Sequence, residues 1–137
     1  MSHAPDPYAT APAAAPALTE ARLGQNCGNW LNKHHRAAYA HFFHIPNGGL
    51  RTAREASALK SQHVKPGVSD YFLALPRGSY HGLWLELKTL TGKVRSEQTD
   101  WLALMAAAGF STALVRDEAT FQQVLTDYLA LPEPHAH

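Results

Sequence analysis

The stretch LWLELK, residues 83–88, places two charged side chains inside an otherwise apolar run. Side chains alternate between the two faces of a β-strand, so the three leucines point one way while Trp84, Glu86 and Lys88 point the other way. Burying a charge is costly unless the charge has a partner. The run therefore predicts a strand with one face in a hydrophobic core and an ionic site on the opposite face.

The rest of the chain suits one compact domain. Its 137 residues are enough for a single core, and none of its apolar runs approaches the length of a membrane-spanning helix. Residues 1–17 are rich in alanine and proline and lack Lys and Arg, which favours a disordered leader over a signal peptide. We expect the domain to occupy residues 18–131 and a flexible tail to occupy residues 132–137. The single cysteine, Cys27, excludes an intramolecular disulfide and fits a reducing cytoplasm.

Charge is segregated along the chain, although the net charge is only +1. Residues 22–95 carry eleven Lys or Arg against three acids, whereas residues 96–137 carry one base against six acids. A basic segment of this size favours a polyanionic partner, because each phosphate that is neutralised releases counterions. A solvated basic surface is the simpler explanation on charge alone, so charge does not decide the function.

The spacing of apolar residues predicts an α/β fold, a mixed sheet of about four strands flanked by helices. Residues 51–67 are polar and basic and are expected to form a loop with a short helical piece. The remaining expected elements are strands at 39–46, 68–75, 80–88 and 111–116, a helix beginning at Thr19, a helix with Ser96 as its N-cap that ends at Gly109, and a helix at 117–131. On the helix that follows Ser96, the side chains expected to face a core are those of Trp101, Leu104, Met105 and Ala108.

A β-hairpin would bring a second acid beside Glu86. If residues 76–80 form the loop, paired positions sum to 156 and Asp70 lies opposite Glu86, with Cβ atoms about 4.5–5.5 Å apart. Like charges at that distance are destabilising, so a cation is expected between them, and carboxylates with water are the ligands that Mg²⁺ prefers. A structural Glu86–Lys88 pair is the plainer alternative, and a register shift of one residue would move Asp70 to the other face.

Four motifs together make the chain resemble the VRR-NUC family of the PD-(D/E)XK nuclease superfamily. They are NGG at 47–49, GVSD at 67–70, LELK at 85–88 and GKVRSEQ at 92–98. The resemblance extends from about Thr19 to Leu129 and implies a restriction-endonuclease-like core that cleaves DNA with a divalent metal. The chain departs from the family pattern at Ser69, where the family usually has a proline before the aspartate.

The resemblance implies roles for individual residues. Asp70, Glu86 and the backbone carbonyl of Leu87 would bind Mg²⁺ or Mn²⁺. Lys88 would position and activate the attacking water, and Gln98 would reach the site from its helix. Glu20 matches an acid that often assists from the first helix of the family, although a carboxylate is equally expected at a helix N-terminus for electrostatic reasons.

The resemblance also implies a substrate and a partner. Stand-alone members resemble phage-type enzymes that cut branched DNA, including four-way junctions, often as homodimers. Candidates for contacting the DNA backbone are Asn47, Arg51, Arg54, Lys60, Lys65, Lys93 and Arg95, and nothing in their spacing indicates base readout. His44 and His81 are weaker candidates near the phosphate path. The alternative function is a catalytically silent DNA-binding module that keeps the nuclease fold.

Overall fold

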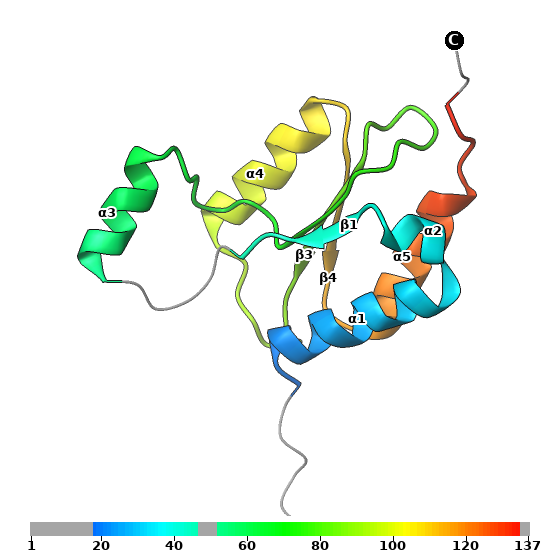
Figure 1. Ribbon diagram of the computed structural model, residues 1–137, viewed down its shortest axis with the longest axis horizontal. Helices are drawn as coiled ribbons and strands as arrows, with labels where there is room; N and C mark the ends of the chain where they lie inside the picture. Colours follow the sequence, from blue (N-terminus) through cyan, green and yellow to red (C-terminus); the bar gives the residue numbers. More distant parts are fainter. Residues whose placement is uncertain (1–17, 47–51, 135–137) are drawn as a thin grey trace, which may run out of the picture.

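The computed structural model describes residues 18–46 and 52–134, so the expected leader at 1–17 and the candidates Asn47 and Arg51 lie outside the described residues. The elements in chain order are α1 (Glu20–His34), α2 (Arg36–Tyr39), β1 (Phe42–His44), α3 (Ala53–Ser61), β2 (Tyr71–Leu73), β3 (Leu83–Leu87), α4 (Ser96–Ala107), β4 (Ser111–Val115) and α5 (Glu118–Ala130). They form a four-stranded mixed sheet with flanking helices (Figure 1), which confirms the predicted fold class.

The strand register agrees with the predicted hairpin. The strand order is β1-β2-β3-β4, and β2 pairs antiparallel with both β1 and β3. Tyr71 lies opposite Leu85 and Leu73 opposite Leu83, so paired positions sum to 156 as expected. Strand β4 runs parallel to β3, and α4 makes the crossover between them, as parallel pairing requires. Asp70, immediately before β2, is thereby carried to the position beside Glu86.

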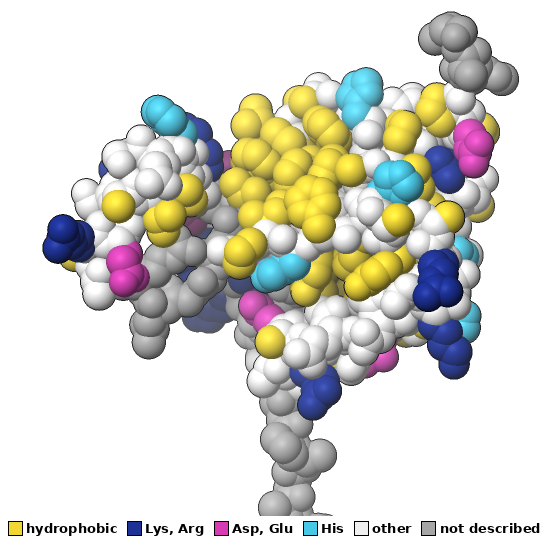
Figure 2. Space-filling model, in the orientation of Figure 1, with side chains coloured by type: hydrophobic (Ala, Val, Ile, Leu, Met, Phe, Trp, Pro, Cys, Tyr) yellow, Lys and Arg dark blue, Asp and Glu magenta, His cyan; other side chains and the backbone are white. Residues whose placement is uncertain are grey.

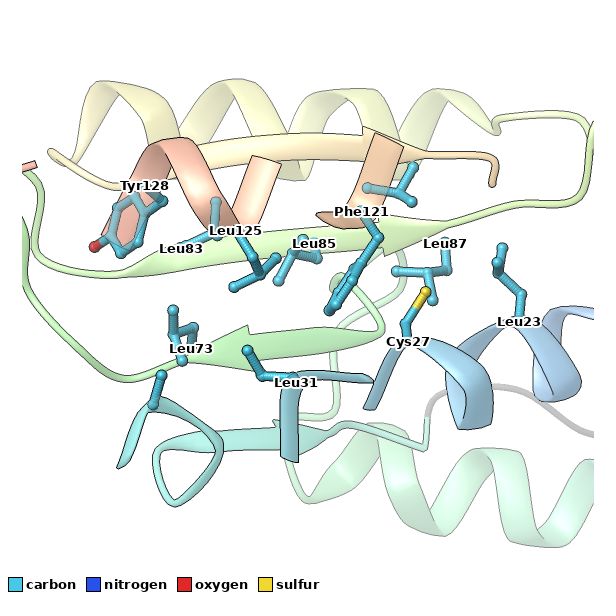
Figure 3. Packing of buried hydrophobic residues seen from close by; sticks show 12 residues of the cluster. Leu23, Cys27, Leu31, Leu73, Leu83, Leu85, Leu87, Phe121, Leu125 and Tyr128 are labelled. Carbon is cyan, nitrogen blue, oxygen red and sulfur yellow. The ribbon is translucent and has the colours of Figure 1, made fainter. Parts of the chain in front are cut away.

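The hydrophobic core lies on one face of the sheet, under α1 and α5 (Figure 3). Leu83, Leu85 and Leu87 all point into it and are at most 1% exposed, as the alternation predicted. Helix α1 contributes Leu23, Cys27 and Leu31, and α5 contributes Phe121, Leu125 and Tyr128. Helix α4 covers part of the opposite face, whereas α3 stands away from the sheet and buries no residue (Figure 1).

Helix α4 differs from the prediction at its beginning. Its N-cap is Arg95, and Ser96 is its first residue rather than the predicted N-cap. The side-chain oxygen of Gln98 accepts a hydrogen bond of 2.9 Å from the backbone N–H of Arg95. This bond closes the first turn around Arg95 and explains why the chain does not use the hydroxyl of Ser96 as a cap.

The predicted core-facing stripe of α4 was wrong for two of its four residues, Leu104 and Ala108, whereas Trp101 and Met105 are half-buried. Leu104 is 60% exposed, Ala108 is exposed, and no residue of α4 is fully buried. Trp101 packs edge-on against Trp84 of the sheet, with ring centroids 5.3 Å apart. The side chains on that side of the helix follow the spacing i, i+3, i+4 and i+7, and they are Gln98, Trp101, Leu102 and Met105. Helix α4 is therefore rotated so that Gln98 faces the sheet.

The ends of other elements also differ from the prediction. The first predicted strand, 39–46, contains only the three residues of β1, because Tyr39 belongs to the short helix α2. The expected tail begins with exposed residues that nevertheless contact the rest of the chain: the carbonyl of Pro132 accepts a 2.7 Å hydrogen bond from the backbone N–H of Gly78, and Glu133 lies 3.4 Å from Arg77. Among the described residues, no helix combines the length and apolar character needed to span a bilayer.

Candidate active site

Two carboxylates meet where β2 begins and β3 ends. Asp70 accepts a 2.9 Å hydrogen bond at Oδ2 from the backbone N–H of Leu87. Glu86 is 1% exposed, and its Oε1 accepts a 2.7 Å hydrogen bond from Nε2 of Gln98. The other oxygen of Glu86, Oε2, is buried and has no hydrogen-bond partner among the described residues. An unpaired carboxylate oxygen in a buried position calls for a cation or a proton.

The pKa of Glu86 reflects this environment. This pKa is raised from the ordinary value of 4.5 to about 8, first by burial and next by the charge of Asp70, while the charge of Lys88 opposes both. Two adjacent carboxyl groups cannot both be ionised cheaply, so without a cation the pair tends to hold one proton. A divalent cation between them would replace that proton.

Lys88 lies beside the pair and is only 7% exposed. Its Nζ is 3.8 Å from Oε1 of Glu86 and 3.8 Å from Oε1 of Glu20, distances longer than a hydrogen bond. The structural Glu86–Lys88 ion pair expected as the plainer alternative is therefore present, at a separation longer than a direct hydrogen bond. The ammonium is held near both acids without being bound closely to either, so it remains available to a third group.

Glu20 reaches this site from the first residue of α1. Its side chain is half exposed, and it lines the same cleft as Asp70, Glu86 and Lys88. Among the described residues, however, no three His, Cys, Asp or Glu side chains come together as a metal-binding group. The role of Glu20 as a third ligand stays a prediction, and so does the role of the Leu87 carbonyl.

Arg116 is a functional candidate that the sequence reasoning missed. Its Nη1 donates to the carbonyls of Thr89 and Gly92, at 2.7 and 2.8 Å, and so holds the loop that joins Lys88 to α4. The bonded loop lies between Lys88 and the helix that carries Gln98. The isolation of Arg116, as the one base among residues 96–137, was a signal that could have identified it.

A cleft of about 690 Å³ opens over the carboxylates, between α3 and the beginning of α4. Its lining includes three of the predicted DNA-contacting bases, Lys60, Lys65 and Arg95. Arg54 and Lys93 do not line it. The three basic side chains that line the cleft share it with Asp70 and Glu86, so one hollow combines positive charge with a pair of carboxylates.

Ser69, the departure from the family pattern, is fully buried, and its hydroxyl has no partner among the described residues. A proline at this position has no hydroxyl group, so it would not bury a hydrogen-bonding group without a partner. The buried serine lowers stability locally, but the neighbouring Asp70 still accepts its hydrogen bond from Leu87.

A mixed sheet between helices, with two carboxylates and a lysine at the adjoining ends of a hairpin, defines a nuclease-type fold. The family model of the VRR-NUC domain matches residues 18–118, and the chain belongs to that family. A solved structure described as a VRR_NUC domain protein is similar to it, with a TM-score of 0.76 and 23% identity over 87% of this chain and 94% of that one. This second likeness supports the fold. A comparison with curated proteins found no match.

Proposed function

We propose that this protein is a divalent-metal-dependent endonuclease that hydrolyses phosphodiester bonds in DNA. The observation that carries the proposal is the buried pair of Asp70 and Glu86, with an unpaired oxygen on Glu86 and the ammonium of Lys88 beside it. A domain that only bound DNA would gain nothing from two adjacent carboxylates facing a basic cleft.

Asp70 and Glu86 would hold Mg²⁺ or Mn²⁺. Both are hard oxygen ligands, and the unpaired Oε2 of Glu86 and the raised pKa of its carboxyl group fit a cation at this point. A cation held there supplies positive charge that polarises a phosphoryl group and makes water a better nucleophile. Gln98 and the N–H of Leu87 each bind one oxygen of the two carboxylates, so the second oxygen of each carboxylate would be the one to bind the cation.

Lys88 would act on the phosphate and on the attacking water. Its charge is preorganised, since it is nearly buried and its position is limited by Glu20 and Glu86. In hydrolysis the water oxygen forms a bond to phosphorus, the bond to the leaving oxygen breaks, and that oxygen takes up a proton. A fixed ammonium stabilises the negative charge that builds up on the phosphate in this step.

The basic wall of the cleft would hold the DNA backbone. Lys60, Lys65 and Arg95 line the cleft and would contact phosphates on either side of the cleaved bond. Contacts of this kind fix the position of DNA without reading its sequence. Arg51 and Asn47, which lie outside the described residues, and Arg54 and Lys93, which lie outside the cleft lining, are further candidates for contacts with longer substrates.

The central experiment compares DNA cleavage and DNA binding in the same variants. Asp70→Asn, Glu86→Gln and Lys88→Ala should each reduce metal-dependent cleavage by about 10²-fold or more while binding survives, because each removes charge from the reacting centre. Lys33→Ala, an exposed base at the end of α1, serves as the matched control and should cleave normally. Full activity in any of the three site variants would refute the assignment.

The second candidate function, a catalytically silent DNA-binding module, makes a different prediction. Wild-type protein would then bind DNA without nicking it in Mg²⁺ or Mn²⁺. The intact set of Asp70, Glu86, Lys88 and Gln98 favours the enzyme. Incubating the purified protein with flap, four-way junction and plain duplex DNA, with and without metal, separates the two functions and identifies the preferred DNA structure.

We further propose that the enzyme acts on branched DNA as a homodimer. Hydrophobic side chains gather in a broad patch on the surface seen in Figure 2, around α4 and the adjoining sheet. Large exposed apolar residues on this side of the molecule include Phe43 and Leu114 of the sheet and Leu104 on α4. A two-fold axis brings the same patch of both subunits together, and a patch without charges can meet itself without repulsion. A dimer would offer two cleavage sites to a substrate with two similar strands.

The oligomeric state tests this proposal directly. Leu104→Glu places a charge on a residue that is already 60% exposed, so the monomer should still fold. We expect wild-type protein to sediment as a dimer and the variant as a monomer in analytical ultracentrifugation. A wild-type monomer at micromolar concentration would contradict the dimer and leave the catalytic proposal unaffected.

A further inference from the structure

A second cleft, of about 430 Å³, lies on the other side of Asp70. It opens between the first turns of α1 and the end of β1, and both Asp70 and Glu20 line it as well as the first cleft. The candidate catalytic centre therefore stands between two hollows rather than at the bottom of one. A DNA strand that places a phosphate at Asp70 would extend into both.

The two clefts differ in chemistry. The first is lined by Lys60, Lys65, Lys88 and Arg95, which suit phosphates. The second has neither Lys nor Arg among the described residues that line it, and it offers the carboxamide of Gln25, the imidazole of His44 and the phenol ring of Tyr71. An uncharged, flat, hydrogen-bonding group fits such a lining better than a phosphate does. In a DNA strand that group is a base.

The ring of His44 is held in place in the second cleft. Its Nδ1 donates a 2.9 Å hydrogen bond to the backbone carbonyl of Asp70, and since a carbonyl can only accept, Nδ1 carries the proton. The imidazole lies against Tyr71 with ring centroids 4.7 Å apart, and Tyr71 stacks on Phe42 at 5.0 Å with an angle of 5° between the planes. His44 is thus the exposed last member of a series of three aromatic rings.

We propose that His44 is the stacking platform for the base next to the cleaved phosphate. This inference rests on the proposed nuclease function and adds the second cleft as a nucleoside subsite. Proteins that hold single strands stack bases on aromatic side chains, His included, and a stacking contact changes affinity by about 5- to 150-fold. A ring that is already fixed loses little freedom when a base stacks on it. The hydrogen bond from His44 to the backbone carbonyl of Asp70 would keep that base close to the residue that carries the catalytic carboxylate.

Two substitutions separate stacking from the hydrogen bond to Asp70. His44→Phe keeps an aromatic ring and loses the donor, whereas His44→Asn keeps a side-chain donor and loses the ring. Stacking predicts that His44→Phe retains kcat/KM within a few-fold and that His44→Asn and His44→Ala lose about ten-fold or more. The reverse order, with Asn active and Phe inactive, would overturn the proposal, because His44 would then act only by holding Asp70.

A substrate change completes the test. Once the cleaved phosphate is mapped, an abasic nucleotide is placed on either side of it. On one side, removing the base should reduce wild-type cleavage by the factor that His44→Ala costs on intact DNA, and His44→Ala should cost nothing further on the abasic substrate. A His44→Ala penalty that persists on both abasic substrates would overturn the proposal.

A binding measurement distinguishes failure of this inference from failure of the proposed function. In the presence of EDTA, 2-aminopurine placed at successive positions of an oligonucleotide should lose fluorescence at one position on binding wild-type protein and His44→Phe. No such loss should occur with His44→Asn. Quenching without any metal-dependent cleavage would refute the nuclease and keep the base subsite, whereas cleavage without His44-dependent quenching would do the opposite.

Discussion

The two faces of the sheet are built on different principles. On the face under α1 and α5, the centre is apolar and almost wholly buried, and β3 contributes Leu83, Leu85 and Leu87 to it. On the face toward α4, three buried polar atoms lack partners among the described residues: Oε2 of Glu86 and Nε1 of Trp84 and of Trp101. The first face supplies stability, and the second accepts a cost in stability at the place where the chemistry is proposed.

The difference is sharpest between two neighbouring residues. Leu85 and Glu86 are adjacent in β3 and are 0% and 1% exposed, so burial alone does not distinguish them. What differs is what surrounds each side chain: leucines and aromatic rings around Leu85, and Asp70, Lys88 and Gln98 around Glu86. The same degree of burial therefore stabilises one residue and strains the other.

The largest expected effect on stability follows from that pair. Leu85→Ala should lower the free energy of unfolding by about 2–5 kcal/mol, since it removes buried methyl groups and leaves a cavity. Glu86→Gln should leave it unchanged or raise it at pH 8, because it removes a buried ionisable group and retains a polar partner for Gln98. Urea unfolding in EDTA measures both. An equal loss of unfolding free energy in the two variants would contradict the view that the two faces of the sheet differ in their contribution to stability.

The pH dependence of stability is the second test. Folding raises the pKa of Glu86 to about 8, so between pH 4.5 and 8 the folded state binds a proton that the unfolded state does not. Stability of the metal-free protein should therefore fall as pH rises through this window, by up to about 1.4 kcal/mol per pH unit. The groups facing Glu86 that influence this titration are Asp70, Lys88 and Glu20.

Glu86→Gln is the control for the pH series, because it leaves every other titrating group in place. The unfolding free energy of the wild type minus that of the variant should fall as pH rises and become constant above about pH 8. Adding Mg²⁺ at pH 8 should raise the stability of wild type more than that of the variant. A difference that does not vary with pH would show that the Glu86 carboxyl is not proton-linked to folding.

The smallest effects come from two glycines one turn apart on α1. A Cβ at Gly24 would overlap the hydroxyl of Tyr71, whereas a Cβ at Gly28 would make an ordinary 3.7 Å contact with Phe42. Gly28→Ala should stabilise the protein by up to about 1 kcal/mol through helix propensity, and Gly24→Ala should destabilise it by about 1–3 kcal/mol. Thermal unfolding of the two variants measures the difference. Stabilisation by both would show that the packing of α1 against Tyr71 is looser than the structure indicates.

The sequence was most informative within single elements and across one short loop. Alternation along residues 83–88 correctly assigned each side chain to a face, and the hairpin register followed from the loop length. The glycine at 109 was correctly identified as the end of a helix, and its φ of 95° explains why a glycine is needed there. These predictions depend on neighbours in the chain, which the sequence displays directly.

Predictions failed where they depended on how a helix is rotated about its axis, or on how separate elements pack against one another. Four apolar residues of α4 were assigned to a stripe, but Leu104 and Ala108 point away from the sheet. Requiring Gln98 to face the site would have selected its i+3, i+4 and i+7 neighbours instead, so the functional hypothesis held information that the apolar pattern alone did not. The contacts of Arg116 and the second cleft depend on residues far apart in the chain, and no local pattern brings those residues together.

The sequence alone determined that Glu86 shares a face with Lys88 and lies across from Asp70, because strand alternation and hairpin pairing are local geometry. The family resemblance implied that Gln98 and Glu20 reach this point from two helices, whereas tertiary structure alone decided how those helices dock and that His44 lies against the backbone carbonyl of Asp70. Docking of separate elements depends on how whole side-chain surfaces fit together, which no short window of residues specifies.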